Sequence, residues 1–428
     1  MSSAIERAVS FHWLRATSTS RCSIAQASVD GEHYLVRYFS LIRRTNAQFR
    51  DLLRSTGATV PVGIVVIDTF CLHALDVPRE LSVPAYGFFP CGAAALAIHL
   101  QLPSIQEKNR ASFAELGDTP LELTGVPPLP ASHVSQLMLL YPAESKVCEG
   151  FTNICKSIAE YDAVMVNTFE SLESRAAGAL RKDSTGLLPA GHVLPPMYCV
   201  GPLVKRGDGG TTAASRGSTG NPTAASCSSA SEARRQEQLR EIAAGLENSG
   251  HRFLWVVQAP RRIDHPNTFL DPPIDPDLDA LLPKGFLERT SGRGVVVKLW
   301  APQGDVLRHR ATGAFVTHCG WNSVLEGIAA GVPMLCWPLY AEQMMNKVVM
   351  VEEMGVAVEM VGWQRGGLVA AEEVEAKVRL VMESEAGGKV RARVTEHMAA
   401  AALAWAHDGA SRAAFARFLS YAEIRRRR

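Results

Sequence analysis

The sequence predicts an α/β protein of two domains, each with a parallel sheet covered by helices on both faces. The chain has 428 residues, which exceeds one ordinary hydrophobic core and suits two domains of roughly 200 residues each. Apolar residues make up 47% and charged residues 20% of the chain, a composition typical of a folded globule. Short apolar runs alternate with amphipathic runs, which is the pattern of buried parallel strands joined by helices.

Six apolar runs are predicted to be strands because each is short and rich in β-branched or aromatic residues. They are residues 62–67, 163–167, 253–257, 294–298, 313–317 and 332–336. The amphipathic run from Glu232 to Asn248 predicts a helix before the third strand. Val374, Val378, Val381 and Met382 have the spacing of the buried face of another helix.

The sequence gives little reason to expect a membrane, a nucleic acid or secretion. Residues 81–106 carry no charged side chain, but Pro84, Pro90 and Pro103 interrupt them, so we expect a buried strand and a core helix there, not a membrane span. The net charge of +1 gives no reason to expect nucleic acid as a partner. Nine scattered cysteines without a CxxC pair, and an N-terminus without a continuous apolar core, favour a cytoplasmic protein.

Residues 204–231 differ in composition from the rest of the chain. They consist mainly of Gly, Ser, Thr and Ala, with almost no large apolar side chain. Such a segment buries too little apolar surface to offset the entropy of ordering, so we expect a flexible linker. It would divide the chain into domains at 1–203 and 232–428.

The stretch THCGWNSVLEG lies where the fifth apolar run turns into a helix-forming run. Ligands of parallel α/β sheets bind beyond the carboxyl ends of the strands, and helix starts attract phosphate. Gly320 would allow close approach of the backbone, and His318, Asn322 and Ser323 could donate to phosphate oxygens. The alternative is structural, because Ser323 and Glu326 fit the S-x-x-E capping box of a helix start.

The sequence around this stretch resembles a known family. The 44 residues from Trp300 to Gln343 resemble the signature box of the plant family-1 UDP-glycosyltransferases, the plant secondary product glycosyltransferase box. The segments VVIDTFCLHALDVPRELSVPAY, VNTFESLESRA, CVGPLV and PDLDALLPKGFLERT also resemble members that glucosylate flavonoid-type phenols. Neither a GxGxxG fingerprint nor a GxxxxGK[ST] loop occurs, which argues against the alternative of an NAD-type oxidoreductase.

The resemblance implies the GT-B fold, in which two Rossmann-like domains face each other across a cleft. It implies an inverting transfer of a sugar from a UDP-sugar to a hydroxyl of a small phenolic acceptor such as a flavonoid. Glucose is the expected sugar, because glucose-using members usually end the box with Gln, as Gln343 does here. We expect a monomer with no metal and no cofactor, since the UDP-sugar is a co-substrate.

The resemblance also implies a role for each residue of the donor site. Trp300 would stack on uracil, Ala301 and Gln303 would address the base edge and ribose, and Glu326 would accept from the ribose hydroxyls. The diphosphate would lie at His318, Asn322 and Ser323, with the backbone of Trp321 at the sugar–phosphate junction. Glu342 and Gln343 would bind sugar hydroxyls, and Cys319, Gly320 and Tyr340 complete the donor-binding set.

The catalytic machinery implied by the resemblance is only partly found. Asp68, at the end of a predicted strand, matches the aspartate that orients the family's general-base histidine. That histidine is not found in this chain, since His12 resembles a later, non-catalytic position; the sequence therefore looks truncated at the N-terminus and altered between the domains. Pro90-Cys91-Gly92 replaces the usual Thr-Ser-Gly. The alternative is thus a UDP-sugar-binding remnant or mis-assembled gene product with impaired catalysis.

Overall fold

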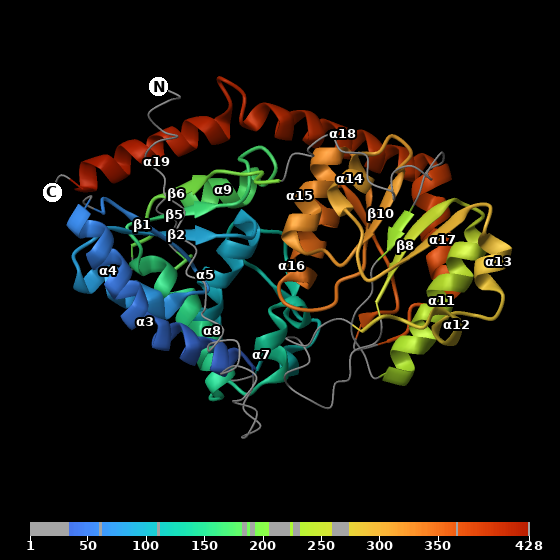
Figure 1. Ribbon diagram of the computed structural model, residues 1–428, viewed down its shortest axis with the longest axis horizontal. Helices are drawn as coiled ribbons and strands as arrows, with labels where there is room; N and C mark the ends of the chain where they lie inside the picture. The colour runs from blue at the N-terminus through green and yellow to red at the C-terminus, as the bar shows by residue number, and fades with distance from the viewer. Residues whose placement is uncertain are drawn as a thin grey trace.

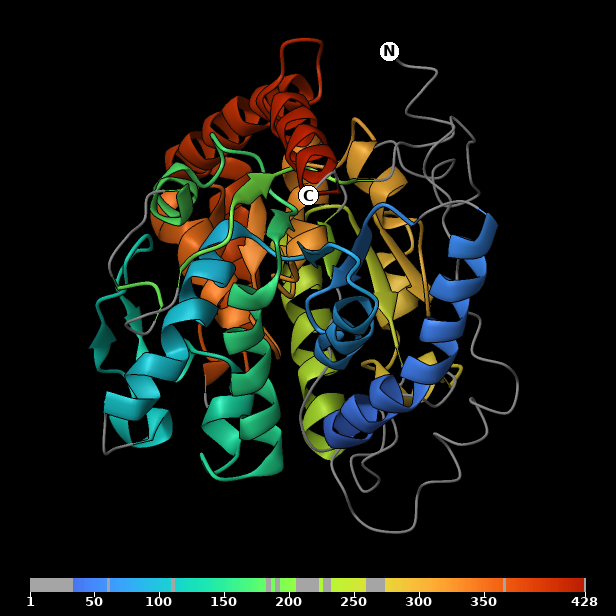
Figure 2. The same ribbon diagram turned by 90° about the vertical axis from the view of Figure 1, so that its left-hand side faces the viewer.

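The computed structural model describes residues 34–59, 62–108, 112–181, 186–188, 193–204, 223–225, 232–258, 274–364 and 367–426. Two α/β halves lie side by side, and two C-terminal helices, α18 (Glu385–Ala404) and α19 (Ala410–Arg426), run across one end of both (Figure 1). Figure 2, turned by 90°, shows these helices in red above both halves. The fold is that of two Rossmann-like domains, as the sequence predicts.

The N-terminal domain is built on a four-stranded parallel sheet with the strand order β1-β2-β5-β6. A separate antiparallel pair joins β3 to β4. The elements of this domain, in chain order, are α3 (Tyr34–Thr59), β1 (Val65–Asp68), η1 (Leu72–Leu75), α4 (Asp76–Glu80), β2 (Ala85–Phe89), α5 (Ala93–Lys108), α6 (Phe113–Leu116), β3 (Pro120–Leu121), β4 (Leu129–Pro130), η2 (Ala131–His133), α7 (Gln136–Leu140), α8 (Lys146–Ser157), η3 (Ile158–Glu160), β5 (Ala163–Val166), α9 (Ser174–Arg181) and β6 (Met197–Cys199).

The C-terminal domain is built on a six-stranded sheet with the order β12-β11-β10-β7-β8-β9, and all of its strand pairs are parallel. Its elements before α18 are β7 (Thr223–Ala225), α11 (Glu232–Ser249), β8 (Phe253–Val257), α12 (Leu278–Leu281), α13 (Phe286–Thr290), β9 (Gly294–Lys298), α14 (Gln303–Arg308), β10 (Ala314–Thr317), α15 (Trp321–Ala330), β11 (Met334–Cys336), α16 (Gln343–Val348), the π-helical turn η4 (Val349–Glu353), β12 (Ala357–Glu359) and α17 (Ala371–Glu383).

The six predicted strands are all present. β8 and β9 have the predicted bounds, and the other four begin or end within a few residues of them. The helix predicted from Glu232 is α11. On α17, Val374, Val378 and Val381 are buried as their spacing predicts, and Met382 is partly buried beside them. Two three-residue strands, β6 and β12, were not predicted, because Met-Tyr-Cys and Ala-Val-Glu are too short to show a period.

The expectation of a flexible linker over residues 204–231 needs a correction at one place. Residues 223–225 form β7, which pairs with β10 on one side and β8 on the other, in the middle of the sheet. A gap between two parallel strands would leave both of their inner edges without hydrogen-bond partners, and the backbone of β7 fills that gap. Apart from Val204, the rest of the expected linker lies outside the described residues.

Helix α5 is a core helix whose start is capped by a buried carboxylate. Its first eleven residues are buried, and Pro103 lies within the helix, so the charge-free segment forms the expected strand and core helix. The buried carboxylate of Glu173 accepts hydrogen bonds from the backbone N–H groups of Ala93 and Ala94, at 2.9 Å each. These bonds cap the start of α5 and fix the turn that precedes it.

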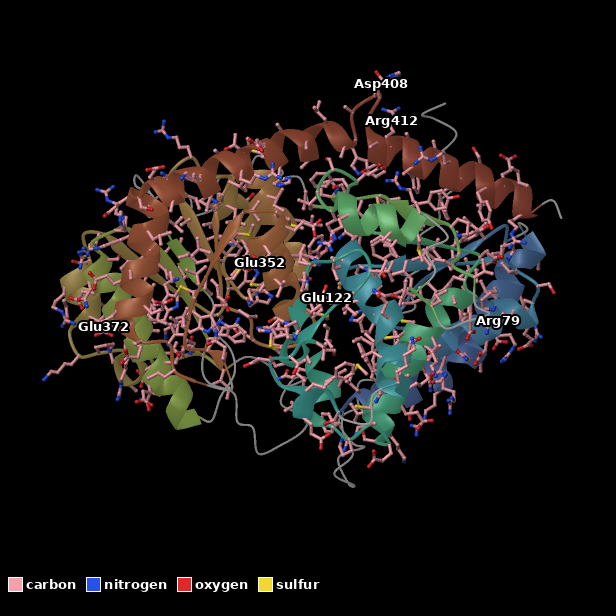
Figure 3. The ribbon with its side chains drawn as sticks, turned by 180° about the vertical axis from the view of Figure 1, so that it is seen from behind. Arg79, Glu122, Glu352, Glu372, Asp408 and Arg412 are labelled. Atoms are coloured by element: carbon pink, nitrogen blue, oxygen red, sulfur yellow. The ribbon has the colours of Figure 1, made fainter. Side chains whose placement is uncertain are left out.

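Helix α19 crosses from the C-terminal domain onto the N-terminal sheet, so the domain boundary expected from the sequence does not hold for the last helix. Phe418 is buried, and its ring meets Tyr86 edge-on at 5.0 Å and Tyr198 at 5.7 Å. The turn before α19 carries Asp408 on the outside of the molecule (Figure 3). An apolar cluster that includes Phe89 and Val324 joins the two domains into one core.

Candidate functional site

Three loops at the carboxyl ends of β9, β10 and β11 carry the residues that the sequence predicts to bind the donor. Each loop contains a non-glycine residue in the left-handed region: Leu299 with φ of 65°, Cys319 with 64° and Ala341 with 56°. Only Ser82 shares this property among the other non-glycine residues that the structure describes. Such strained conformations gather at functional sites, where the fold holds them for the sake of geometry.

Helix α15 begins inside the central stretch of the site. Gly320 is its N-cap, no side chain caps it, and the helix starts at Trp321. The capping-box alternative is therefore wrong, because Ser323 is the third residue of the helix and not its cap. Among the described residues, no side chain accepts from the N–H groups of this first turn, and together with the helix dipole these groups form a site for an anion.

The residues expected to bind ribose and phosphate lie together. The side-chain amide of Gln303, at the start of α14, donates to Glu326 Oε2 at 2.7 Å and to Ser323 Oγ at 3.0 Å. Gln303 and Glu326 come from different helices, so this contact holds α14 against α15. The cluster presents a carboxylate, a hydroxyl and an amide, which are the groups that hydrogen-bond sugar hydroxyls and phosphate oxygens.

An exposed indole ring lies at the end of β9. Trp300 is 72% exposed, which is unusual for a Trp and leaves its ring available to a ligand. Ala301 beside it is buried against Leu254 and Val306, so the loop is anchored at the residue that follows the free indole. A planar ring held in this way is suited to stacking on a base.

His318 follows β10 and lies close to Tyr340, with ring centroids 6.4 Å apart and planes at 24°. Burial lowers the pKa of His318, so its imidazole is neutral near pH 7 and has one N–H to donate. Gly320 is needed next to it, because a Cβ there would lie 2.3 Å from His318 Nε2. The buried Cys319 holds this turn through its carbonyl, which accepts from Asn346 Nδ2 at 2.9 Å.

The sugar-binding candidates lie at the start of α16. Glu342 is the N-cap residue of this helix, and desolvation raises its pKa. Gln343 is buried, and its side-chain oxygen accepts from the backbone N–H groups of Leu339 and Tyr340 at 2.9 Å each. Gln343 therefore shapes the loop before it, and its amide nitrogen is the atom left for a ligand.

The N-terminal domain reaches this site at Cys91 and Asn167. The Cys91 thiol is 3.6 Å from Glu342 Oε1, and desolvation together with the charge of Glu342 raises the pKa of this thiol well above its ordinary value. The thiol is therefore protonated and donates to the carboxylate. The indole N–H of Trp321 donates to the carbonyl of Asn167 at 2.7 Å. Neither Cys91 nor Asn167 was predicted as a site residue, because only the folded chain brings them to the donor loops.

Asp68 lies at the carboxyl end of β1, as predicted. Its Oδ1 accepts from the backbone N–H of Phe70 at 2.9 Å, and neighbouring protein atoms raise its pKa by desolvation although the residue keeps contact with solvent. No histidine within the described part of the chain hydrogen-bonds to Asp68. His12 lies outside the described residues. The role of Asp68 as the orienting carboxylate stays a prediction.

The described residues contain neither a metal-binding cluster nor a membrane-spanning helix. No group of three or more His, Cys, Asp or Glu side chains there has the arrangement to hold a metal ion. No helix there combines the length and the apolar character that crossing a membrane requires.

Two Rossmann-like domains that meet at the loops after β9, β10 and β11 have the architecture of the GT-B class of nucleotide-sugar transferases. Comparisons with known proteins agree with this class. The model of the family described as UDP-glucoronosyl and UDP-glucosyl transferase matches residues 212–386. Anthocyanidin 5,3-O-glucosyltransferase of a Rosa hybrid cultivar is 36% identical over 420 residues, covering 97% of this chain and 84% of the relative.

Further relatives lead to the same family. Phloretin 2'-O-glucosyltransferase of Pyrus communis is 40% identical over 394 residues, covering 85% of this chain and 78% of the relative. The structure of Phytolacca americana UGT2, complexed with UDP-2fluoro-glucose and pterostilbene, matches with a TM-score of 0.80 and 30% identity, covering 94% of this chain and 85% of that one. The chain belongs to the UDP-glycosyltransferase family, a family of hexosyl-transferring enzymes.

Proposed function

We propose that this protein transfers glucose from UDP-glucose to a hydroxyl of a small phenolic acceptor of the flavonoid type. The single observation that carries the proposal is the cluster of Gln303, Ser323 and Glu326 beside the uncapped start of α15. The names of the relatives support the acceptor class, since they include glucosyltransferases of anthocyanidin and phloretin.

The donor site would hold the three parts of UDP-glucose with separate groups. Trp300 offers an exposed ring to uracil, and the carboxylate of Glu326 can accept from ribose hydroxyls. The first turn of α15, with Asn322 and the neutral His318, offers N–H donors to the diphosphate. Glu342, at the contact with Cys91, would accept from hydroxyls of the sugar.

Transfer needs a nucleophile on one face of the anomeric carbon and a stabilised leaving group on the other. Attack by the acceptor oxygen forms the new C–O bond as the bond to UDP breaks, and this single displacement inverts the configuration. The helix dipole and N–H donors of α15 would stabilise the charge that develops on the leaving diphosphate. As it attacks, the acceptor hydroxyl loses its proton to a base. We propose that Asp68 orients this base on the acceptor side, and that the reaction needs neither a metal nor a cofactor.

Two measurements test the proposal in sequence. Calorimetric titration of the full chain with UDP tests the donor site, and an assay for glucosylated product with UDP-glucose and flavonols or dihydrochalcones tests transfer. We expect both UDP binding and product. UDP binding without product would support the alternative of a catalytically impaired UDP-sugar-binding protein, and absence of UDP binding would contradict the donor site itself.

A further inference from the structure

Asn167 occupies a central position between the two domains. It follows β5 directly and is only 3% exposed. Its side chain and backbone contact three other segments: the loop after β2, the segment after β6 and the first turn of α15. A buried amide is costly unless its donors and acceptors are satisfied, so each contact constrains the others.

The orientation of the Asn167 amide follows from its partners. The backbone N–H of Leu203 donates to Oδ1 at 2.9 Å, and the carbonyl of Pro90 accepts from Nδ2 at 3.3 Å. A backbone N–H can only donate and a carbonyl can only accept, so the amide cannot be turned over without losing both bonds. There is also little free space around it, because a Cβ on Gly201 would lie 2.9 Å from Oδ1.

The fixed amide of Asn167 sets the orientation of a second amide. Its Nδ2 also faces Oδ1 of Asn322 at 3.4 Å, and only the oxygen of Asn322 can accept from it. The amide nitrogen of Asn322 is therefore turned away from Asn167. Asn322 is exposed and is the second residue of α15, where the N–H groups of the first turn have no side-chain cap.

The backbone of Asn167 holds the same turn in place. Its carbonyl accepts from the indole N–H of Trp321, the first residue of α15, at 2.7 Å. This bond is buried, and an indole N–H can only donate. One residue of the N-terminal domain thus fixes both the position of the α15 start and the way the side chain of Asn322 faces.

We propose that Asn167 is a positioning residue of the donor site, which orients Asn322 so that its NH₂ group, and not its carbonyl oxygen, faces the diphosphate. The inference rests on the proposed donor site and deepens it. It makes phosphate recognition by the C-terminal domain depend on an amide of the N-terminal domain. The effect is specific to the phosphate groups, because the uracil and ribose groups of the site, Trp300 and Glu326, do not contact Asn167.

The Asn167→Asp variant tests this orientation. The introduced carboxylate can still accept from Leu203, but it has no donor for Asn322 Oδ1. Asn322 would then rotate, donate to this carboxylate and present its own oxygen to the diphosphate. We expect UDP affinity, measured by calorimetry, to fall at least tenfold, while uridine affinity, measured by ligand-observed NMR, stays within twofold of wild type. Equal losses for UDP and uridine, or an unchanged UDP affinity, would overturn the proposal.

A double-mutant comparison separates orientation from direct charge repulsion. In an Asn322→Ala background, Asn167→Asp should change UDP affinity by less than twofold, because the amide that it reorients is absent. A loss that persists in this background would mean that the new carboxylate acts on the diphosphate by itself, and it would overturn the role of Asn322 as the intermediary.

A second variant covers the case in which Asn167→Asp does not fold. Asn167→Ser removes the amide donor to Asn322 without adding charge, and the same selective loss of UDP affinity over uridine affinity is expected. Thermal unfolding checks that each variant is folded before binding is measured. Failure of the wild-type chain to bind UDP would contradict the proposed function; wild-type binding with equal losses in the variants would contradict only the inference about Asn167.

Discussion

Single residues of the site have two kinds of role, and the contacts distinguish them. Trp300 and Asn322 are exposed, so their side chains are available to bind a ligand. Gln343, in contrast, is buried and satisfies two backbone N–H groups of its own loop. The same signature therefore contains side chains that are exposed to solvent and a side chain that holds its own loop in shape.

Replacing Glu326 by Ala should weaken UDP binding. The carboxylate is the acceptor expected for the ribose hydroxyls, and hydrogen bonds to a charged group contribute about 1.5–3 kcal/mol, which corresponds to roughly a tenfold to hundredfold loss of affinity. Calorimetric titration with UDP measures this loss of affinity. Glu372→Ala is the control, because this residue is exposed at the start of α17 and lies at the outer edge of the C-terminal domain (Figure 3). Equal affinity of Glu326→Ala and wild type would contradict the ribose role.

Buried histidines predict how stability depends on pH. His99, on α5, is 4% exposed and packs edge-on against Phe89 and Phe151. Burial lowers its pKa from an ordinary value of 6.5 to about 4. Below pH 6.5 the unfolded chain therefore binds a proton that the folded chain does not, and stability falls as the pH decreases toward 4.

The His99→Leu variant isolates this contribution. From the shift of the pKa, we expect the acid-induced loss between pH 7 and pH 5 to be smaller by about 2 kcal/mol in the variant than in wild type. Urea unfolding at the two pH values measures the difference. The comparison uses the change with pH within each protein, so a constant packing effect of the substitution cancels. The same dependence of stability on pH in both proteins would contradict the lowered pKa of His99.

At the level of elements, the short strand β7 holds the C-terminal sheet together. It has three residues, yet it joins β10 to β8 and so connects the two halves of the C-terminal sheet. The sequence around it indicates a linker because Thr, Ala and Ala give no hydrophobic signal. Its place is set by the backbone groups of the strands on either side, which need hydrogen-bond partners.

A proline in β7 should destabilise the C-terminal domain. Ala224 pairs with Phe315 on one side and Leu254 on the other, and Pro at this position cannot donate to the ladder and does not fit a central strand. We expect Ala224→Pro to lose about 1–3 kcal/mol of stability, the cost of leaving a buried backbone group without its hydrogen-bond partner, measured by urea unfolding. Ala224→Ser keeps the N–H group and serves as the control. Equal stability of the two variants would mean that β7 does not hold the sheet together.

At the level of the whole molecule, the last helix links the two domains. The chain leaves the C-terminal domain with α18 and returns to the N-terminal sheet with α19 (Figure 1). The donor loops and the N-terminal domain also meet directly at Cys91 and Asn167. These contacts fix the position of one domain relative to the other. A substitution at the boundary should therefore alter both the donor site and the acceptor side.

Removing the anchor of α19 tests this link. Phe418 is 1% exposed, and truncating a buried Phe costs about 3–5 kcal/mol, so Phe418→Ala should lower thermal stability and speed proteolysis near the C-terminus. Ile424→Ala on the same helix is the control, since Ile424 is 56% exposed and surface changes are usually within about 0.5 kcal/mol. Equal effects of the two substitutions would contradict the docking of α19.

The sequence by itself determined the features that depend on neighbouring residues. The strands β8 and β9, the buried stripe of α17 and the family were all predicted, because periodicity and a contiguous signature are local properties. Tertiary structure alone decided the place of β7, the docking of α19 and the contact between Trp321 and Asn167, which are 154 residues apart. Each of these features is a contact between segments that are distant in the sequence. Such a contact depends on which backbone groups and side chains still need a partner once the rest of the chain has folded, and no local sequence pattern specifies it.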